Sequence, residues 1–195
     1  QLQGFFNVPL DNLSARPILL EACRQLSVEQ SVVVAPDTGS LKMAREFAEQ
    51  LGSDLAVVDK RRISATEVES MHIIGNVAQR TVFLVDDICS TAGTLVKAAE
   101  ACRKAGAKEI YAFTTHGLCV SGAVKKVESS PIKKVFVSNT IPDSEQINSE
   151  RFETISVAKI FSRAIQCINS DSSITSLFRE DGKELMFDAE TVLTH

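Results

Sequence analysis

Residues 82–95 read VFLVDDICSTAGTL and lead from an apolar strand, through a loop of small residues, into an apolar helical segment. Two adjacent carboxylates, Asp86 and Asp87, stand where the first apolar run ends. A strand that passes directly into a helix is the repeating unit of a parallel sheet covered by helices. This stretch therefore predicts an α/β fold, with two acidic side chains and a loop of hydroxyls at one strand end.

The same alternation of short apolar runs and amphipathic stretches continues over most of the chain. Strands are predicted at 31–35, 54–59, 81–86, 109–116 and 134–140. Helices are predicted at 40–51, 94–106 (closed by Gly106), 121–128, 156–168 and 172–178. Residues 60–80 read as a polar connection. The repetition predicts a parallel sheet with helices on both faces.

The composition fits one ordinary globular domain and argues against several kinds of partner. The 21 basic and 25 acidic residues give a net charge of −4, which favours neither nucleic acid nor an anionic membrane. No apolar run approaches the roughly 18 residues of a membrane span, and the first residues do not read as a secretory signal. The five scattered cysteines contain no CxxC pair. They indicate reduced thiols and a cytoplasmic protein, and Cys89 is predicted to be a buried small residue rather than a nucleophile.

In parallel sheets, ligands bind beyond the carboxyl ends of the strands. Polar stretches that follow the predicted strands are therefore expected to share one edge of the sheet. They are APDTGS (35–40), DKRR (59–62), DDICSTAGT (86–94) and THGLCVSG (115–122). His116, in the last of them, is predicted to make a structural hydrogen bond.

The loop DDICSTAGT combines donors for an anion with acceptors for hydroxyl groups. Backbone N–H groups at the start of a helix form an anion site, and Gly93 would let a ligand approach the backbone. Asp86 and Asp87 can accept hydrogen bonds from a vicinal diol or hold water on Mg²⁺. This combination suits a ribose 5-phosphate. Taken alone, the loop fits a capped turn with solvated aspartates equally well.

The stretch APDTGS also leaves a strand and enters a helix. Gly39 and Ser40 would offer a second set of free amides, and Asp37 is the natural carboxylate for a Mg²⁺ that bridges a diphosphate. Alone, an ordinary Asp–Gly turn would be the better interpretation. Two phosphate-binding loops on one sheet edge suit a sugar that is phosphorylated at both ends.

The stretch VDDICSTAGT resembles the phosphoribosyl pyrophosphate (PRPP) loop of type I phosphoribosyltransferases and ribose-phosphate pyrophosphokinases. Other stretches narrow the resemblance to the second family, the PRPP synthetases. In order from residue 1 to about 178 they are QLQGFFNVPLDNL, APDTGSLKMAREFAEQL, KRRISATEVE, GAKEIYAFTTHG, SGAV, VSNTI, SVAKIFSRAI and SITSLF. The resemblance implies a type I phosphoribosyltransferase-like fold. It also implies transfer of the diphosphoryl group of MgATP to the 1-hydroxyl of ribose 5-phosphate, giving PRPP and AMP.

The resemblance further implies a role for each site residue. Lys60 and Arg62 would be the catalytic cations that stabilise charge on the transferring diphosphoryl group. The ribose 5-phosphate site would comprise Asp86, Asp87, Ser90, Thr91, Ala92, Gly93 and Thr94, and the pyrophosphate loop Asp37, Thr38, Gly39 and Ser40. Asp37 would bind Mg²⁺, the expected cofactor. The expected ligands are ribose 5-phosphate, ATP and PRPP, and the expected assembly is a homo-oligomer without nucleic acid or membrane.

Three features depart from the family pattern. The residues after Asp37 and Gly39 vary (Thr38 and Ser40), which should be tolerated because the backbone amides would bind the phosphate. Ser90 stands where many bacterial members carry aspartate, and with TEVE (66–69) it looks more like the archaeal branch. Family members also carry an N-terminal half, with most of the ATP site, ahead of the segment that begins this chain. We therefore expect 1–15 to be a connector or strand left from that half, 16–178 to be the ribose-phosphate-binding domain, and 179–195 to be a tail or hairpin. The chain alone is expected to lack most of the ATP site.

Two alternatives stay open. A phosphoribosyltransferase would use the same loop to bind PRPP for base transfer, but it would not need Lys60, Arg62 or QLQGFFNVPLDNL. A non-catalytic, PRPP-sensing subunit associated with the synthetase is favoured by the expected lack of the N-terminal half. The presence of Lys60, Arg62, Asp37 and Asp86 argues against it.

Overall fold

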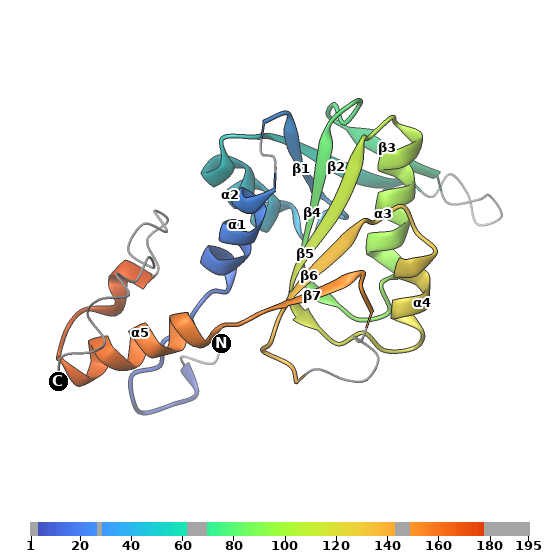
Figure 1. Ribbon diagram of the computed structural model, residues 1–195. Helices are drawn as coiled ribbons and strands as arrows, with labels where there is room; N and C mark the ends of the chain where they lie inside the picture. The colour runs from blue at the N-terminus through green and yellow to red at the C-terminus, as the bar shows by residue number, and fades with distance from the viewer. Residues whose placement is uncertain (1–3, 27–28, 62–69, 143–148, 178–195) are drawn as a thin grey trace.

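The computed structural model describes residues 4–26, 29–61, 70–142 and 149–177 (Figure 1). In this part of the chain, one seven-stranded sheet has the order β3-β2-β1-β4-β5-β6-β7. The strands are β1 (Ser31–Ala35), β2 (Asp54–Arg61), β3 (Ser70–Ile74), β4 (Thr81–Cys89), β5 (Glu109–Gly117), β6 (Lys134–Ser138) and β7 (Phe152–Ile155). The helices are α1 (Arg16–Gln25), α2 (Leu41–Leu51), α3 (Gly93–Lys104), α4 (Ala123–Glu128), α5 (Ala158–Asn169) and the 3₁₀ helix η3 (Ile174–Leu177).

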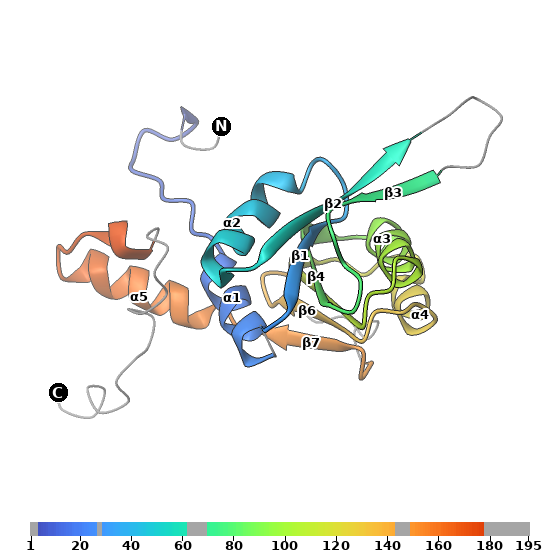
Figure 2. The same ribbon diagram turned by 90° about the horizontal axis from the view of Figure 1, so that it is seen from above.

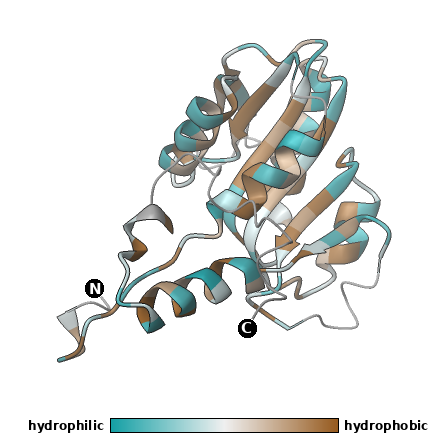
Figure 3. Ribbon diagram, turned by 60° about the vertical axis from the view of Figure 1, so that its left-hand side comes forward, coloured by the Kyte–Doolittle hydropathy of each residue, from teal (hydrophilic) through white to brown (hydrophobic). Residues whose placement is uncertain are grey.

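All neighbouring strands pair in parallel except β2 and β3. Helices α1 and α2 cover one face of the sheet, whereas α3 and α4 cover the other (Figures 1 and 2). Successive residues of β4 alternate between the two cores, with Val82 and Leu84 in one and Phe83 and Val85 in the other. Burial on both faces explains why the central strands are continuous apolar runs (Figure 3). The predicted parallel sheet with helices on both faces is confirmed.

The prediction of a polar connection at 60–80 is wrong for residues 70–74, which form the antiparallel strand β3. It pairs with β2 from Val57↔Ile74 to Arg61↔Ser70 and forms a ribbon that extends beyond the body of the sheet (Figure 2). β3 is an edge strand, and its Ile74 is 61% exposed. Because little of this strand is buried, its sequence lacks the continuous apolar run that marked the central strands.

Three further elements differ from the prediction. Helix α1 was not predicted, and it carries Pro17 in its first turn, where proline is compatible with a helix. β7 was also missed, because only Phe152 of its four residues is buried. The helix predicted at 172–178 is the short 3₁₀ helix η3. Gly106 follows the end of α3 with a φ of 88°, as expected of a residue that closes a helix.

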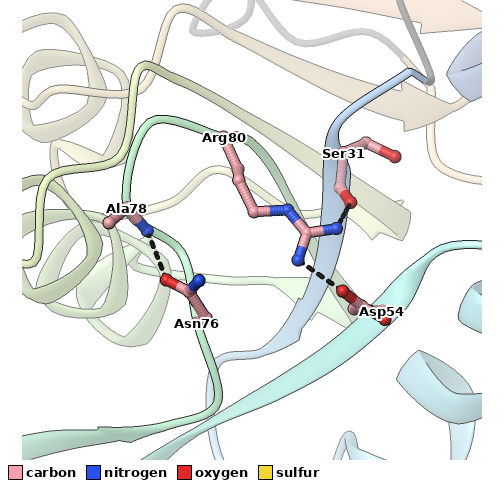
Figure 4. Close-up of polar contacts among 5 residues, drawn as sticks. All are labelled: Ser31, Asp54, Asn76, Ala78 and Arg80. Carbon is pink, nitrogen blue, oxygen red and sulfur yellow. Dashed lines mark hydrogen bonds and ion pairs between the residues drawn. The ribbon is translucent and has the colours of Figure 1, made fainter.

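Arg80 ties together the amino ends of the strands (Figure 4). Its guanidinium donates one hydrogen bond to the Ser31 carbonyl, at the start of β1, and another to the carboxylate of Asp54, at the start of β2. Since Arg80 directly precedes β4, one side chain aligns three neighbouring strands. The carboxyl ends of the same strands lie at the opposite edge of the sheet.

In the described ranges, no helix is both long enough and apolar enough to span a lipid bilayer.

Candidate functional site

The two predicted phosphate loops meet where the strand order changes direction. β1 and β4 are hydrogen-bonded neighbours, yet the helix after β1 covers one face of the sheet and the helix after β4 covers the other. Such a switch point opens a crevice at the carboxyl ends of the two strands, which is where open α/β sheets bind ligands. The structure therefore brings the residues after β1 and after β4 to one place.

Two adjoining cavities occupy this crevice and share Asp37, Asp86 and Asp87. The smaller, of about 230 Å³, is lined by the three shared residues and by residues 88–95. The larger, of about 490 Å³, is lined by the shared residues and by Ser14, Arg16, Gly39, Ser40, Lys42, Met43 and Glu46. Three carboxylates thus stand between a strand–helix loop on one side and the start of α2 on the other.

The loop after β4 ends at an uncapped helix. Ala92 is the N-cap residue of α3 and makes no side-chain cap hydrogen bond, so the first-turn amides keep their capacity to bind an anion. Ala92 has a φ of 59°, whereas the prediction had assigned backbone freedom to Gly93. A left-handed conformation costs an alanine about 1 kcal/mol. Such strain is characteristic of functional loops.

The loop after β1 differs from its prediction. The amides of Gly39 and Ser40, expected to be free, both donate to Oδ1 of Asp37, at 2.9 and 3.1 Å. The Ser40 hydroxyl donates to the Asp37 carbonyl at 3.2 Å. Asp37 therefore occupies the local anion position in the turn that precedes α2, as aspartates in such turns do. A phosphate bound by these amides would have to replace the carboxylate oxygen.

The surroundings of Asp86 disfavour its ionised form. Burial raises its pKa from the usual 3.8 to about 6, and the negative charges of Asp37 and Asp87 add to the increase. A hydrogen bond of 3.0 Å from the Asp87 amide to Asp86 Oδ1 acts in the opposite direction. Among the described residues, no ion pair neutralises Asp37, Asp86 or Asp87. The crevice is therefore a site that a cation would stabilise.

The chemistry of this donor set fits Mg²⁺. All three side chains offer carboxylate oxygens, the ligands that hard divalent cations prefer. In the described ranges, no group of three His, Cys, Asp or Glu side chains is arranged to hold a metal alone. Mg²⁺ in proteins is usually bound by one or two carboxylates together with water and substrate phosphates.

Only one of the two predicted catalytic cations, Lys60, belongs to the described part of the chain. Lys60 belongs to β2 and pairs with Met71 of β3. Arg62 lies outside the described residues. β2 is the neighbour of β1 in the sheet and parallel to it, so Lys60 lies near the end of β2 that points toward the crevice edge. The catalytic roles of Lys60 and Arg62 stay predictions.

Sequence reasoning missed two cations in the larger cavity, Arg16 and Lys42. Arg16 begins the unpredicted helix α1 and forms an ion pair with Glu46 of α2. Lys42 lies in the first turn of α2, five positions after Asp37. That spacing could have drawn attention to Lys42, whereas Arg16 could be found only by predicting how α1 packs.

Two other predictions about individual side chains are confirmed. His116 Nδ1 forms a hydrogen bond of 2.7 Å with the Thr140 hydroxyl, a structural role. Cys89 is 1% exposed. A hydrogen bond with Cys119 and burial raise the pKa of the Cys89 thiol, so it is a neutral core group rather than a nucleophile.

A third cavity lies between β3 and α3, away from the predicted residues. Its volume is about 800 Å³, and its lining includes His72, Lys97, Glu100 and Lys104. It is larger than either cavity of the crevice.

Comparisons with known proteins agree with this picture. A family model described as "Phosphoribosyl synthetase-associated domain" matches residues 60–179. A "Ribose-phosphate pyrophosphokinase" of Caldanaerobacter subterraneus subsp. tengcongensis is 45% identical over 179 residues, which are 91% of this chain and 57% of that protein. One from Neisseria meningitidis serogroup A is 41% identical over 182 residues, covering 93% and 56%.

A solved structure extends the similarity to three dimensions. The crystal structure of phosphoribosylpyrophosphate synthetase from Mycobacterium smegmatis matches with a TM-score of 0.79 and 29% identity. The match covers 88% of this chain and 56% of that one. The chain thus spans little more than half the length of the relatives it matches.

Proposed function

The chain belongs to the family of phosphoribosyl synthetase-associated domains, and from this premise we propose that it is the ribose-phosphate-binding part of a ribose-phosphate pyrophosphokinase. The reaction is transfer of the diphosphoryl group of MgATP to the 1-hydroxyl of ribose 5-phosphate. A bond forms between that hydroxyl oxygen and the β-phosphorus of ATP, the bond to AMP breaks, and the hydroxyl proton is released. The products are PRPP and AMP.

The observation that carries the proposal is the pair of adjoining cavities with three shared carboxylates. In the proposed complex, the 5-phosphate lies in the smaller cavity against residues 90–94 and the first turn of α3. Asp86 and Asp87 accept hydrogen bonds from the ribose hydroxyls. This orientation directs the 1-hydroxyl toward the loop after β1 and the larger cavity.

The raised pKa of Asp86 is useful to such a site. A carboxylate in a partly dehydrated position accepts hydrogen bonds from sugar hydroxyls in a low local dielectric, where those bonds are stronger. Above pH about 6 the side chain is ionised and acts only as an acceptor. Ribose binding is therefore proposed to weaken as the pH falls below about 6.

Diphosphoryl transfer requires positioning and charge stabilisation more than covalent chemistry. We assign the charge stabilisation to Lys60 and Arg62. Mg²⁺, held by Asp37 together with the phosphates, would neutralise the diphosphate. Asp37 has one carboxylate oxygen committed to the Gly39 and Ser40 amides, so its other oxygen is the proposed metal ligand.

The adenosine of ATP is proposed to bind to the part of such proteins that this chain does not span. We also propose that the protein forms homo-oligomers and is located in the cytoplasm. The cytoplasmic location is supported by the five cysteines, which are all free thiols.

The test is AMP formation from ATP and ribose 5-phosphate with Mg²⁺, followed by chromatography, with a reaction lacking the sugar phosphate as control. AMP that forms only with ribose 5-phosphate supports a complete synthetase. Binding of ribose 5-phosphate by calorimetry without AMP formation supports either the ribose-phosphate-binding part of a synthetase, without its ATP site, or the non-catalytic, PRPP-sensing alternative. Release of pyrophosphate from PRPP on addition of a nucleobase would instead identify a phosphoribosyltransferase. A chain that shows no AMP formation and no binding of ribose 5-phosphate would contradict the proposal.

A further inference from the structure

Three consecutive carbonyl groups, of the last residue of β4 and the first two residues of the loop after it, accept hydrogen bonds from one segment, residues 119–126. The amide of Cys119 donates to the Cys89 carbonyl at 3.0 Å, and the amide of Val120 donates to the Ser90 carbonyl at 3.0 Å. The third donor is a side chain: Nζ of Lys126, on α4, lies 3.2 Å from the Thr91 carbonyl oxygen. The last of these three contacts is therefore the one that carries a charge.

The Lys126 contact lies at the strained point of the loop. The Thr91 carbonyl belongs to the peptide that leads into Ala92, whose φ is 59°. A peptide unit is planar, so fixing the direction of its carbonyl oxygen fixes the orientation of the whole unit. The amino group of Lys126 thus helps to hold Ala92 in a conformation that an alanine adopts at a cost of about 1 kcal/mol. That conformation determines how the first turn of α3 faces the smaller cavity.

Charge gives Lys126 a second effect. The smaller cavity is lined by three aspartates and, among the described residues, by no lysine or arginine. A phosphate monoester carries about −1.5 to −2 charge near neutral pH and would enter this acidic surrounding. The amino group of Lys126, which is not among the residues that line the cavity, supplies positive charge next to the Thr91–Ala92 peptide.

We propose that Lys126 is a positioning residue for the 5-phosphate of ribose 5-phosphate, acting through the Thr91–Ala92 peptide without touching the ligand. This inference rests on the proposed function, because it takes the phosphate monoester to lie in the smaller cavity.

The test is calorimetric titration of ribose 5-phosphate into the wild-type chain and into K126A, K126R and K125A. Lys125 is a matched control, since it is the preceding, exposed residue of α4 and donates no side-chain hydrogen bond to the described part of the loop. K126A is expected to lower the affinity about tenfold, equivalent to about 1.4 kcal/mol. K126R, which keeps donor and charge, is expected to restore the affinity to within about threefold, and K125A to leave it unchanged. The K126A defect should shrink as salt screens the charge.

The outcomes separate this inference from the proposed function. Wild-type binding with equal affinity for K126A overturns the role of Lys126 and leaves the proposed function intact. Equal losses in K126A and K126R, with a lowered melting temperature in both, indicate a purely structural contact and also overturn it. Absence of ribose 5-phosphate binding by the folded wild-type chain overturns the proposed function, and the inference with it.

Discussion

Replacing Asp86 by asparagine is expected to stabilise the protein while it damages the site. In the native chain, burial and the charges of Asp37 and Asp87 raise the Asp86 pKa from 3.8 to about 6. Folding therefore disfavours the ionised form that predominates at neutral pH. Asparagine has nearly the same shape, and its Oδ1 can still accept the hydrogen bond that the Asp87 amide donates at 3.0 Å. The substitution removes the unfavourable charge and keeps the contact.

The size of the effect follows from the pKa. A rise from 3.8 to about 6 corresponds to about 3 kcal/mol, at about 1.36 kcal/mol per pH unit. Asp86 keeps part of its contact with water, and solvent screening reduces the expected gain to about 1.5 kcal/mol. The native carboxyl binds its proton more tightly than the unfolded one. The stability linked to this group is therefore fully present below pH 3.8 and is lost as the pH rises through about 6. The advantage of Asp86→Asn is thus greatest above pH about 6 and disappears below pH 3.8.

Urea unfolding of both proteins at several pH values measures this difference directly. Asp86→Asn should have the higher free energy of unfolding at about pH 8, and the two curves should converge toward about pH 4. Asp87→Asn is the matched control: its side chain is exposed, so the free energy of unfolding should change by less than about 0.5 kcal/mol. An Asp86→Asn protein that is less stable than wild type at about pH 8, or whose gain is independent of pH, would refute the electrostatic reasoning. The same variant should bind ribose 5-phosphate more weakly, a trade of function for stability.

Three other predictions test the loops and the sheet. Asp37→Ala removes the acceptor of two loop amides and should cost about 1 kcal/mol of unfolding free energy. Asp37→Asn should keep the stability, and both variants should lose any Mg²⁺-dependent gain in PRPP affinity measured by calorimetry; a gain that persists in Asp37→Asn would remove the proposed metal ligand. Ala92→Val places a β-branched residue at a φ of 59° and should cost about 2 kcal/mol in urea unfolding, whereas an unchanged midpoint would show that the left-handed conformation is not maintained. Gly75→Ala would bring a new Cβ within 2.6 Å of the Ala56 Cβ at a φ of 118°, and we expect a loss of about 3 kcal/mol. Gly52→Ala, at a φ of 62° with open space around it, should cost only about 1 kcal/mol, and equal losses at the two glycines would contradict the close packing of β3 on β2.

The strands that could be predicted are those whose burial on both faces requires a run of apolar residues. β1 and β4 are covered on both faces, so SVVVA and TVFLV are unbroken apolar runs that indicate a central strand directly. β3 and β7 lie at the edges of the sheet, and their partial burial leaves short, mixed sequences. Their strand character depends on pairing partners that only the folded chain supplies.

The composition of the candidate site was predictable, but its internal contacts were not. The rule that ligands bind at carboxyl strand ends placed the stretches after β1 and β4 at one edge, and the structure brings them into one crevice. The sequence could not reveal that the amides of Gly39 and Ser40 donate hydrogen bonds to Asp37. An Asp–Gly turn is equally compatible with amides that are free to bind a ligand. Nor could the sequence show that Lys126, 35 positions away, reaches the Thr91 carbonyl. Such contacts depend on how α4 packs against α3.

The most direct test of the central claim is to map ribose 5-phosphate onto the chain by NMR. We expect the amide shifts on titration to concentrate in residues 86–95 and 37–40, around the two cavities of the crevice. Ribose serves as a control and should leave residues 90–95 nearly unaffected. Shifts confined to the third cavity, between β3 and α3, around His72, Lys97 and Lys104, would contradict this expectation and would move the phosphate site away from the carboxyl ends of β1 and β4.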